Sequence, residues 1–345
     1  MKFKNALKRI VAPVLMRSHD WIEWLNDRLH ILIECVPEYS EKEWYLTLGS
    51  IYPAWQERCD VRFFKNFAVR DKYLPGADVL IGTWFSGELL ARSPKLKLVQ
   101  LITTGTEFLD ELNAGKKIMI TTAAGLSARG VAEHILLLML ALDRRLDLAV
   151  RQQDRRQWKQ DRILPGIRGL GGRTAGVIGM GNIGRAVASV LSSMQMTVVY
   201  YDTRLDVKCN VAERCGSLEE LLTRSDFVIL CVPLNDATSR MINEKELKRM
   251  KKSAYLINIG RGQVMDEKAL VNVLRQGVIA GAGIDVTAAE PLHFFSPLWN
   301  CPNLIITPHV AGNIFSFRKA IMTRFVSNIR EFMSGRVLEG EWNGR

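Results

Sequence analysis

The stretch of sequence that decides the fold is Val177-Ile178-Gly179-Met180-Gly181-Asn182-Ile183-Gly184. It contains the pattern Gly-x-Gly-x-x-Gly, directly after an apolar run and directly before a helical pattern at 185–193. Glycines at such a turn let the chain bend sharply and let backbone N–H groups approach a pyrophosphate. The pattern alone is common, and a strand-to-helix turn without a ligand can carry the same glycines. Its position favours a dinucleotide site formed by Gly179, Gly181, Asn182, Ile183 and Gly184.

Asp202 stands where the ribose of a bound dinucleotide is expected. It lies 18 residues past Gly184 and directly after the apolar run 197–201. A carboxylate at the end of this second strand accepts hydrogen bonds from ribose hydroxyls and repels a 2′-phosphate. The sequence therefore predicts NAD as the cofactor, while the nearby Arg204 keeps NADP open.

Short β-rich runs alternate with helical patterns on both sides of this stretch. Before it they occupy 31–35, 61–64, 79–81 and 98–102, and from it onward 175–178, 197–201, 227–232, 255–259, 280–286 and 304–306. This alternation is typical of parallel sheets with crossover helices, so we expect an α/β protein. The six later runs resemble a doubly wound dinucleotide-binding sheet.

The domain borders follow from length and from two helical patterns. A chain of 345 residues exceeds the usual size of one domain. Residues 131–146 are apolar on nearly all sides, as in a helix between two bodies, and 313–334 form an amphipathic helix. We expect a basic extension at 1–28, a discontinuous substrate-binding domain at 29–126 and 313–345, and an NAD-binding domain at 127–312. The apolar surface of 131–146 also predicts a homodimer.

The composition excludes several classes of protein. The longest apolar run, 135–142, is too short to span a membrane. The formal charge of +11 includes a basic region at 144–173 that acidic residues dilute, which favours solvated surface over nucleic-acid binding. The charge can equally draw in acidic substrates.

Two further features concern the compartment. The six cysteines show no metal-ligand spacing, so we expect reduced thiols, no metal site and a cytoplasmic location. Residues 1–19 are basic, but Pro13 interrupts their apolar stretch, so a surface helix is favoured over a secretory or organelle signal.

Three residues that carry chemistry follow predicted strand ends. Arg261 comes after the run 255–259, Glu290 after 280–286 and His309 after 304–306. Ligands of open α/β sheets bind beyond the carboxyl ends of the strands. A guanidinium there can hold a carboxylate at two points. Each residue alone also fits a structural role, as a solvated arginine, a turn glutamate or a hydrogen-bonding histidine.

These residues stand in motifs that resemble those of the D-2-hydroxyacid dehydrogenases over about residues 60 to 335. Besides the glycine stretch, the motifs are Asn258-Ile259-Gly260-Arg261-Gly262, Gly283-Ile284-Asp285-Val286 running to Glu290-Pro291-Leu292, and Thr307-Pro308-His309-Val310-Ala311-Gly312. The resemblance implies two Rossmann-like doubly wound domains with a cofactor cleft between them. It also implies Arg261, Glu290 and His309 as the catalytic set, with Asp285 beside the nicotinamide carboxamide. Further cofactor contacts are expected at the strand ends Val232, Pro233, Ile259 and Gly260.

The reaction that the resemblance implies is the interconversion of a small 2-keto acid and its D-2-hydroxy acid. Negative charge builds on the keto oxygen as hydride arrives, so a proton donor must stand beside it, and His309 suits that role. Glu290 would hold the imidazole and favour its charged form, Arg261 would anchor the substrate carboxylate, and the hydride chemistry belongs to the cofactor. Glyoxylate, hydroxypyruvate and larger keto acids all remain open.

The first domain is expected to supply the other wall of the site. Amides of the Thr104-Gly105 loop correspond to those that hold the substrate carboxylate in the family, although Glu107-Phe108 departs from the usual pair. Trp84 and Phe85 occupy the position of contacts to the substrate side chain, but they fit ordinary core equally well.

Three rival functions stay open at this point. The first is an NAD-binding regulatory module, similar to a corepressor, on the same scaffold. The second is a phosphite-type dehydrogenase; a formate enzyme is disfavoured because such enzymes replace the glutamate. The third, a nucleic-acid or lipid binder, rests on charge alone.

Overall fold

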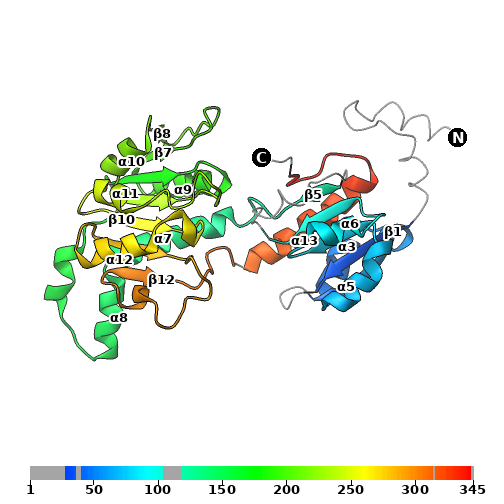
Figure 1. Cartoon of the computed structure of the whole chain (residues 1–345), viewed down its shortest axis with the longest axis horizontal. Helices are drawn as coiled ribbons and strands as arrows, with labels where there is room; N and C mark the ends of the chain where they lie inside the picture. Colours follow the sequence, from blue (N-terminus) through cyan, green and yellow to red (C-terminus); the bar gives the residue numbers. More distant parts are fainter. Residues whose placement is uncertain (1–27, 36–39, 104–117, 314, 343–345) are drawn as a thin grey trace. The chain divides into compact units, whose positions relative to one another are not determined.

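A computed structural model describes residues 28–35, 40–103, 118–313 and 315–342. The chain divides into two compact units: one takes its described residues from 1–126 and 315–345, the other from 127–314. Each unit is a parallel sheet with helices on both faces (Figure 1). The α/β class expected from the sequence is therefore confirmed.

The sheet of the first unit has five parallel strands in the order β2-β1-β3-β4-β5. Their bounds are β1 Leu29–Glu34, β2 Cys59–Phe64, β3 Val79–Gly82, β4 Leu98–Leu101 and β5 Met119–Thr121. In the register of the sheet, Ile31 of β1 lies opposite Val61 and Val79. The sequence did not predict β5, because three residues are too few to show a strand pattern.

Helices cover both faces of this sheet. On one face, Trp44 of α3 (Glu41–Ile51) packs in the same core as Phe325 of α13 (Phe315–Met333). On the other face, α5 (Phe67–Tyr73) and α6 (Gly87–Ala91) contribute Val69 and Leu90. The short helix α4 (Trp55–Arg58) precedes β2.

The C-terminal helix is fastened to this sheet by buried polar groups. The Gln100 side chain on β4 donates to the carbonyl of Phe325 at 3.1 Å and accepts from Asn328 at 3.2 Å. Thr121 donates to the same Gln100 oxygen at 3.1 Å. Because buried polar groups are costly when unpaired, this network specifies where α13 packs.

The sheet of the second unit has seven parallel strands in the order β12-β11-β10-β9-β6-β7-β8. Their bounds are β6 Thr174–Ile178, β7 Thr197–Tyr201, β8 Glu213–Arg214, β9 Phe227–Leu230, β10 Tyr255–Asn258, β11 Gly281–Ile284 and β12 Leu304–Ile306. Six of these correspond to predicted runs, and β8 is an addition of only two residues. The strand order reverses between β6 and β9, which is where doubly wound sheets bind ligands.

Two layers of helices enclose this second sheet. One face carries α7 (Ala128–Asp143) and α9 (Asn182–Ser193), and the other carries α10 (Leu218–Arg224), α11 (Glu244–Arg249) and α12 (Glu267–Arg275). Short 3-10 turns occupy Leu74–Gly76, Gln160–Arg162, Leu164–Gly166, Gly262–Val264 and Pro297–Asn300.

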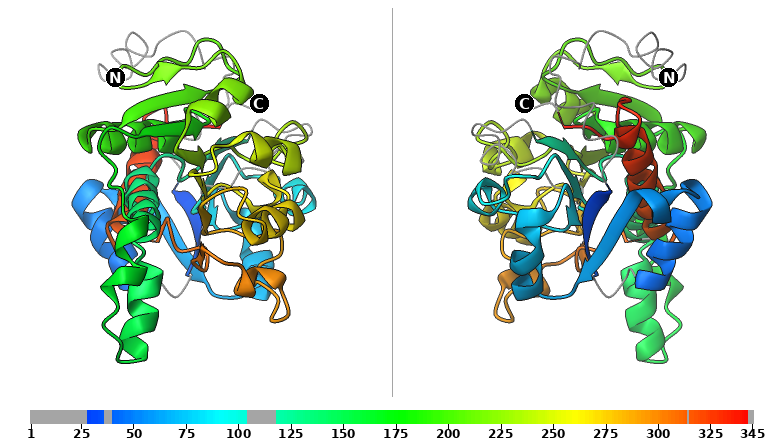
Figure 2. Two further views of the ribbon diagram at one scale, coloured as in Figure 1. Left: turned by 90° about the vertical axis from the view of Figure 1, so that its left-hand side faces the viewer. Right: turned by 90° about the vertical axis from the view of Figure 1, so that its right-hand side faces the viewer.

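The helix predicted at 131–146 is two helices in the structure. Helix α7 ends at Asp143, Arg145 adopts a left-handed conformation with φ of 54°, and α8 (Leu146–Asp154) follows. Helix α8 extends away from the sheet of its unit (Figure 2). Most apolar residues of α7 pack within their own unit. The exposed apolar side chains of this region are Leu137 on α7 and, on α8 and beyond, Leu146, Val150, Trp158 and Leu164.

In the part of the chain that the structure describes, no helix is long and apolar enough to cross a membrane.

Candidate active site at the carboxyl edge of the second sheet

The glycine stretch forms the turn between β6 and α9. Gly179 has a φ of 91°, which side-chain-bearing residues rarely adopt, and a Cβ there would lie 2.8 Å from the carbonyl oxygen of Cys231. Helix α9 begins after Gly181 without a side-chain cap, whereas α10, α11 and α12 are capped by Ser217, Asn243 and Asp266. The first N–H groups of α9 are thus not used by a cap and fit a pyrophosphate.

Asp202 lies directly after β7 and beside this turn. Its carboxylate accepts the Met180 N–H at 2.8 Å and two bonds from the Arg204 guanidinium at 3.1 Å each. Burial alone would raise the pKa of the Asp202 carboxyl, but the hydrogen bonds from Arg204 and Met180 lower it to about 2. The group is therefore an anion at neutral pH. The Arg204 side chain is more than half exposed, whereas the Asp202 side chain is 7% exposed.

The other expected cofactor neighbours line the same edge. A Cβ added at Gly179 or at Gly260 would lie 2.8 Å from an atom of Val232, so the ends of β6, β9 and β10 meet there. The Pro233 carbonyl accepts the Thr238 hydroxyl at 2.6 Å, and Ile259 is buried. These positions fit a nicotinamide dinucleotide that runs across the reversal in strand order.

His309 and Glu290 form a hydrogen-bonded pair at this edge. The Nδ1 atom of His309 lies 2.6 Å from Glu290 Oε2, and the other carboxylate oxygen accepts the Thr287 N–H at 3.1 Å. The side chains are 50% and 38% exposed. Among the described residues, the Nε2 atom of His309 has no hydrogen-bond partner, so it is the ring nitrogen that can address a substrate oxygen.

Arg261 lies on the neighbouring turn, directly after β10. Its Nη1 atom donates to the carbonyl of Gly260 at 2.8 Å, and the Asn258 side chain donates to the Arg261 carbonyl at 3.1 Å. A Cβ at Gly262 would collide with the backbone of Thr287 and Ala288, so only glycine lets this turn pack against the loop that carries Glu290. The structure therefore sets the Arg261 turn directly against the Glu290 loop.

Asp285 makes contacts that the sequence did not predict. Its side chain is only 1% exposed, and its oxygens accept hydrogen bonds from Thr307, Val310 and Ala311. The expected place of Asp285 beside the nicotinamide carboxamide stays a prediction. They tie Asp285 to the segment that carries His309.

The first unit holds the remaining candidates. Trp84 is exposed in the loop after β3, whereas Phe85 is 1% exposed and packs in the core, which leaves Trp84 as the candidate for a substrate contact. The Glu34 carboxylate, which sequence reasoning missed, accepts the Thr83 N–H at 2.7 Å and the Thr83 hydroxyl at 2.9 Å, and so fixes this loop. The expected contacts at Thr104 and Gly105 lie outside the described residues.

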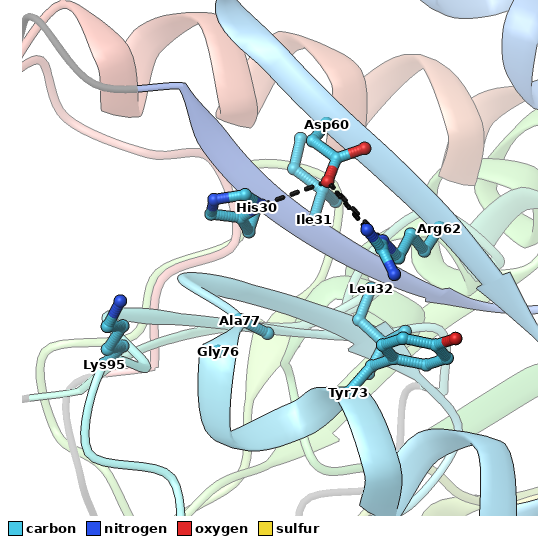
Figure 3. Close-up of a pocket in the computed structure, with 9 residues that line it drawn as sticks. All are labelled: His30, Ile31, Leu32, Asp60, Arg62, Tyr73, Gly76, Ala77 and Lys95. Atoms are coloured by element: carbon cyan, nitrogen blue, oxygen red, sulfur yellow. Dashed lines mark hydrogen bonds and ion pairs between the residues drawn. The ribbon is translucent and has the colours of Figure 1, made fainter.

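A cavity of about 250 Å³ opens at the other edge of the same sheet, near the amino ends of β1 and β2. Asp60 lies between His30 and Arg62 there, 3.1 and 3.4 Å from their nearest nitrogens, with Lys95 on the opposite wall (Figure 3). Because Trp84 follows the carboxyl end of β3, this cavity is separate from the candidate substrate wall.

Comparison with known proteins agrees with this geometry. Residues 136–311 match the model of the D-isomer specific 2-hydroxyacid dehydrogenase NAD-binding domain. The chain is 36% identical over 256 residues to a glyoxylate reductase of Korarchaeum cryptofilum, an alignment that covers 72% of this chain and 77% of the relative.

Solved structures give the same result. A D-isomer specific 2-hydroxyacid dehydrogenase family protein of Aeromonas salmonicida is similar with a TM-score of 0.76 at 26% identity, over 92% of this chain and 99% of the other. An acyclic imino acid reductase in complex with NADPH and D-Arg has a TM-score of 0.79 at 25% identity, over 91% of this chain and all of the other. The resemblance seen in the sequence is thereby confirmed: the chain belongs to the D-isomer specific 2-hydroxyacid dehydrogenase family, NAD-dependent oxidoreductases that act on CH–OH groups.

Proposed function

We propose that this protein reduces a small 2-keto acid to its D-2-hydroxy acid, with His309 as the proton donor. The observation that carries the proposal is the 2.6 Å contact between His309 Nδ1 and Glu290 at the carboxyl edge of the nucleotide-binding sheet. Because Nδ1 is paired with Glu290, the Nε2 atom of the half-exposed imidazole is left to bind a substrate. The 36% identity to a glyoxylate reductase supports glyoxylate and keto acids of similar size as substrates.

The residues divide the work of the reaction. NADH supplies the hydride when it is bound. His309 gives its Nε2 proton to the keto oxygen as negative charge develops there. Glu290 accepts the Nδ1–H of the same ring, which fixes the ring orientation and leaves Nε2 to face the substrate. Arg261 holds the substrate carboxylate with its planar guanidinium.

The two units have different tasks in this proposal. The second unit, near residues 127–312, binds NAD through Gly179, Gly181, Asn182, Ile183, Gly184 and Asp202. The first unit, 29–126 together with 313–345, binds the substrate, with Trp84 and the Thr104-Gly105 loop as its contacts. We further propose a homodimer, for which the exposed apolar side chains on and after α8 provide surface, and a cytoplasmic setting, which fits six free cysteines.

The proposal is tested by following NADH oxidation with a panel of 2-keto acids that includes glyoxylate, hydroxypyruvate and branched or aromatic members. The same panel is repeated with an added amine, because one structural neighbour is an imino acid reductase. A third set supplies NAD with phosphite or formate. Turnover of a 2-keto acid alone supports the proposal. Turnover only with amine or with phosphite would replace it, and NADH binding without any turnover would favour the regulatory module.

A further inference from the structure

A buried chain of polar groups lies behind the His309 loop, and its last member is His134 on α7. We propose that His134 is a positioning residue: through Thr307 and Asp285 it fixes the loop that carries His309. The effect of His134 on catalysis rests on the proposed function. The effect of His134 on the conformation of the His309 loop does not depend on that function.

Asp285 is the centre of this network and clamps the loop from both of its carboxylate oxygens. Oδ1 accepts the Thr307 hydroxyl at 2.6 Å and the Val310 N–H at 3.0 Å, and Oδ2 accepts the Ala311 N–H at 2.9 Å. The backbone carbonyl of Asp285 also accepts the His309 N–H at 2.8 Å. One residue directly after β11 thus accepts hydrogen bonds from His309, from Thr307 before it, and from Val310 and Ala311 after it.

The loop needs such a clamp because of the backbone conformation of His309. Its φ is 53°, in the left-handed region that residues with a side chain seldom adopt. Such a conformation persists only where the surrounding contacts determine it. The bonds from Asp285 to His309, Val310 and Ala311 are the contacts that do so, and they hold the imidazole in reach of Glu290.

His134 completes the network from a helix far away in the sequence. Its Nε2 atom lies 2.9 Å from the Thr307 hydroxyl oxygen and 3.5 Å from Asp285 Oδ1, and its side chain is 12% exposed. A hydroxyl has a single hydrogen, and the Thr307 hydrogen points to Asp285. Thr307 must therefore accept from His134, so Nε2 carries a hydrogen. This bond sets the direction of the Thr307 hydroxyl and leaves its lone pair satisfied.

The contacts of Asp285 indicate that the network positions the loop that carries His309. Among the described residues its carboxylate already receives two backbone N–H groups and one hydroxyl, and a fourth donor, His134, lies within 3.5 Å. Losing His134 would leave a buried hydroxyl oxygen without its donor and loosen the bond from Thr307 to Asp285. A small displacement of a proton donor is enough to lower the rate strongly.

The test compares two substitutions that differ in one hydrogen-bond donor. His134→Leu removes the donor, whereas His134→Gln keeps an N–H at a similar reach. We expect His134→Leu to lower kcat about tenfold, with KM and the Kd for NADH within about twofold, and His134→Gln to keep at least about half of kcat. Glu133→Gln, an exposed neighbour on α7 that pairs only with Arg129 among the described residues, is the matched control and should leave kcat unchanged.

A second measurement does not depend on turnover. Hydrogen–deuterium exchange of peptides covering 307–313 should be about tenfold faster in His134→Leu and in Thr307→Val than in the wild type, and unchanged in His134→Gln. Two results would overturn the proposal. The first is an exchange rate like that of the wild type in both His134→Leu and Thr307→Val. The second is a kcat in His134→Gln as low as that in His134→Leu. If the wild type reduces no keto acid, the proposed function fails, while the exchange data still decide the role of His134.

Discussion

Asp202 sets the choice of cofactor in this account. The structure keeps its carboxylate at the end of β7 with a pKa of about 2, so it is charged throughout the working range of pH. NADH should bind at least about tenfold tighter than NADPH, a difference of roughly 1.4 kcal/mol. Asp202→Ala should narrow this gap mainly by improving NADPH binding, because it removes repulsion of the 2′-phosphate.

Fluorescence titration with both cofactors checks this prediction. Asp202 does not titrate between about pH 5 and pH 8, since its pKa is about 2. The preference of the wild type for NADH should therefore grow over this range only as the 2′-phosphate of NADPH, with a second pKa of about 6, gains charge. Arg204→Ala is the companion variant, because it removes the cation that pairs with Asp202. Equal affinities of the wild type for NADH and NADPH would contradict the assignment.

Arg261 makes a different prediction, about the substrate. Arg261→Lys should raise KM for the keto acid by about tenfold or more and change kcat less, because an ammonium keeps the charge but cannot reproduce a two-point grip on a carboxylate. Steady-state kinetics at saturating NADH measure the changes in KM and kcat separately. An unchanged KM would show that the guanidinium does not hold the substrate.

The role of a single residue could be predicted from the sequence where the residue belongs to a motif. It could not be predicted where the role depends on how distant parts of the chain pack together. The sequence placed Glu290 and His309 after neighbouring strand ends, and in the structure they meet at 2.6 Å. Phe85 was ambiguous, since an aromatic after a strand reads alike in a core or in a pocket wall. The pairing of His134 with Thr307 had no local signal, because the two residues come together only through the packing of α7 on the sheet.

Among the secondary-structure elements, β9 and β10 were easy to predict because each is a continuous apolar run. The short strands β5 and β8 were missed. The break between α7 and α8 was also missed, because the left-handed residue between them is Arg145 and not a glycine, which would have indicated a helix end. Those errors leave the α/β class and the doubly wound second sheet unaffected. The exposed apolar side chains available for a dimer lie mainly on and after α8, with Leu137 on α7.

The exposed apolar side chains on and after α8 predict self-association. Sedimentation should give about twice the 39.0 kDa mass of one chain. Trp158→Glu should shift the protein toward the monomer, because the substitution puts a charge where an apolar contact would form. Val337→Glu, at another exposed apolar residue in the first unit, is the control and should stay dimeric. A wild-type monomer at micromolar concentration would refute the prediction.

The chain as a whole should behave as two bodies joined at two places. The compact units meet in sequence near residues 126 and 315. Limited proteolysis should release an NAD-binding fragment with ends near 127 and 312, because connections between domains are cleaved before their cores are. A stable fragment that ends near residue 170 would be evidence against this division.

The central claim is that His309 donates the proton in keto-acid reduction, and the most direct measurement is kcat of His309→Ala with one accepted keto acid, beside its Kd for NADH. We expect a kcat about 10² to 10⁴ times lower, the usual worth of a positioned acid. NADH affinity should be nearly unchanged, because the cofactor contacts proposed at Gly179, Gly181 and Asp202 do not involve His309. If His309→Ala kept the wild-type kcat, the proton-donor assignment would be contradicted and a regulatory NAD-binding role would gain support.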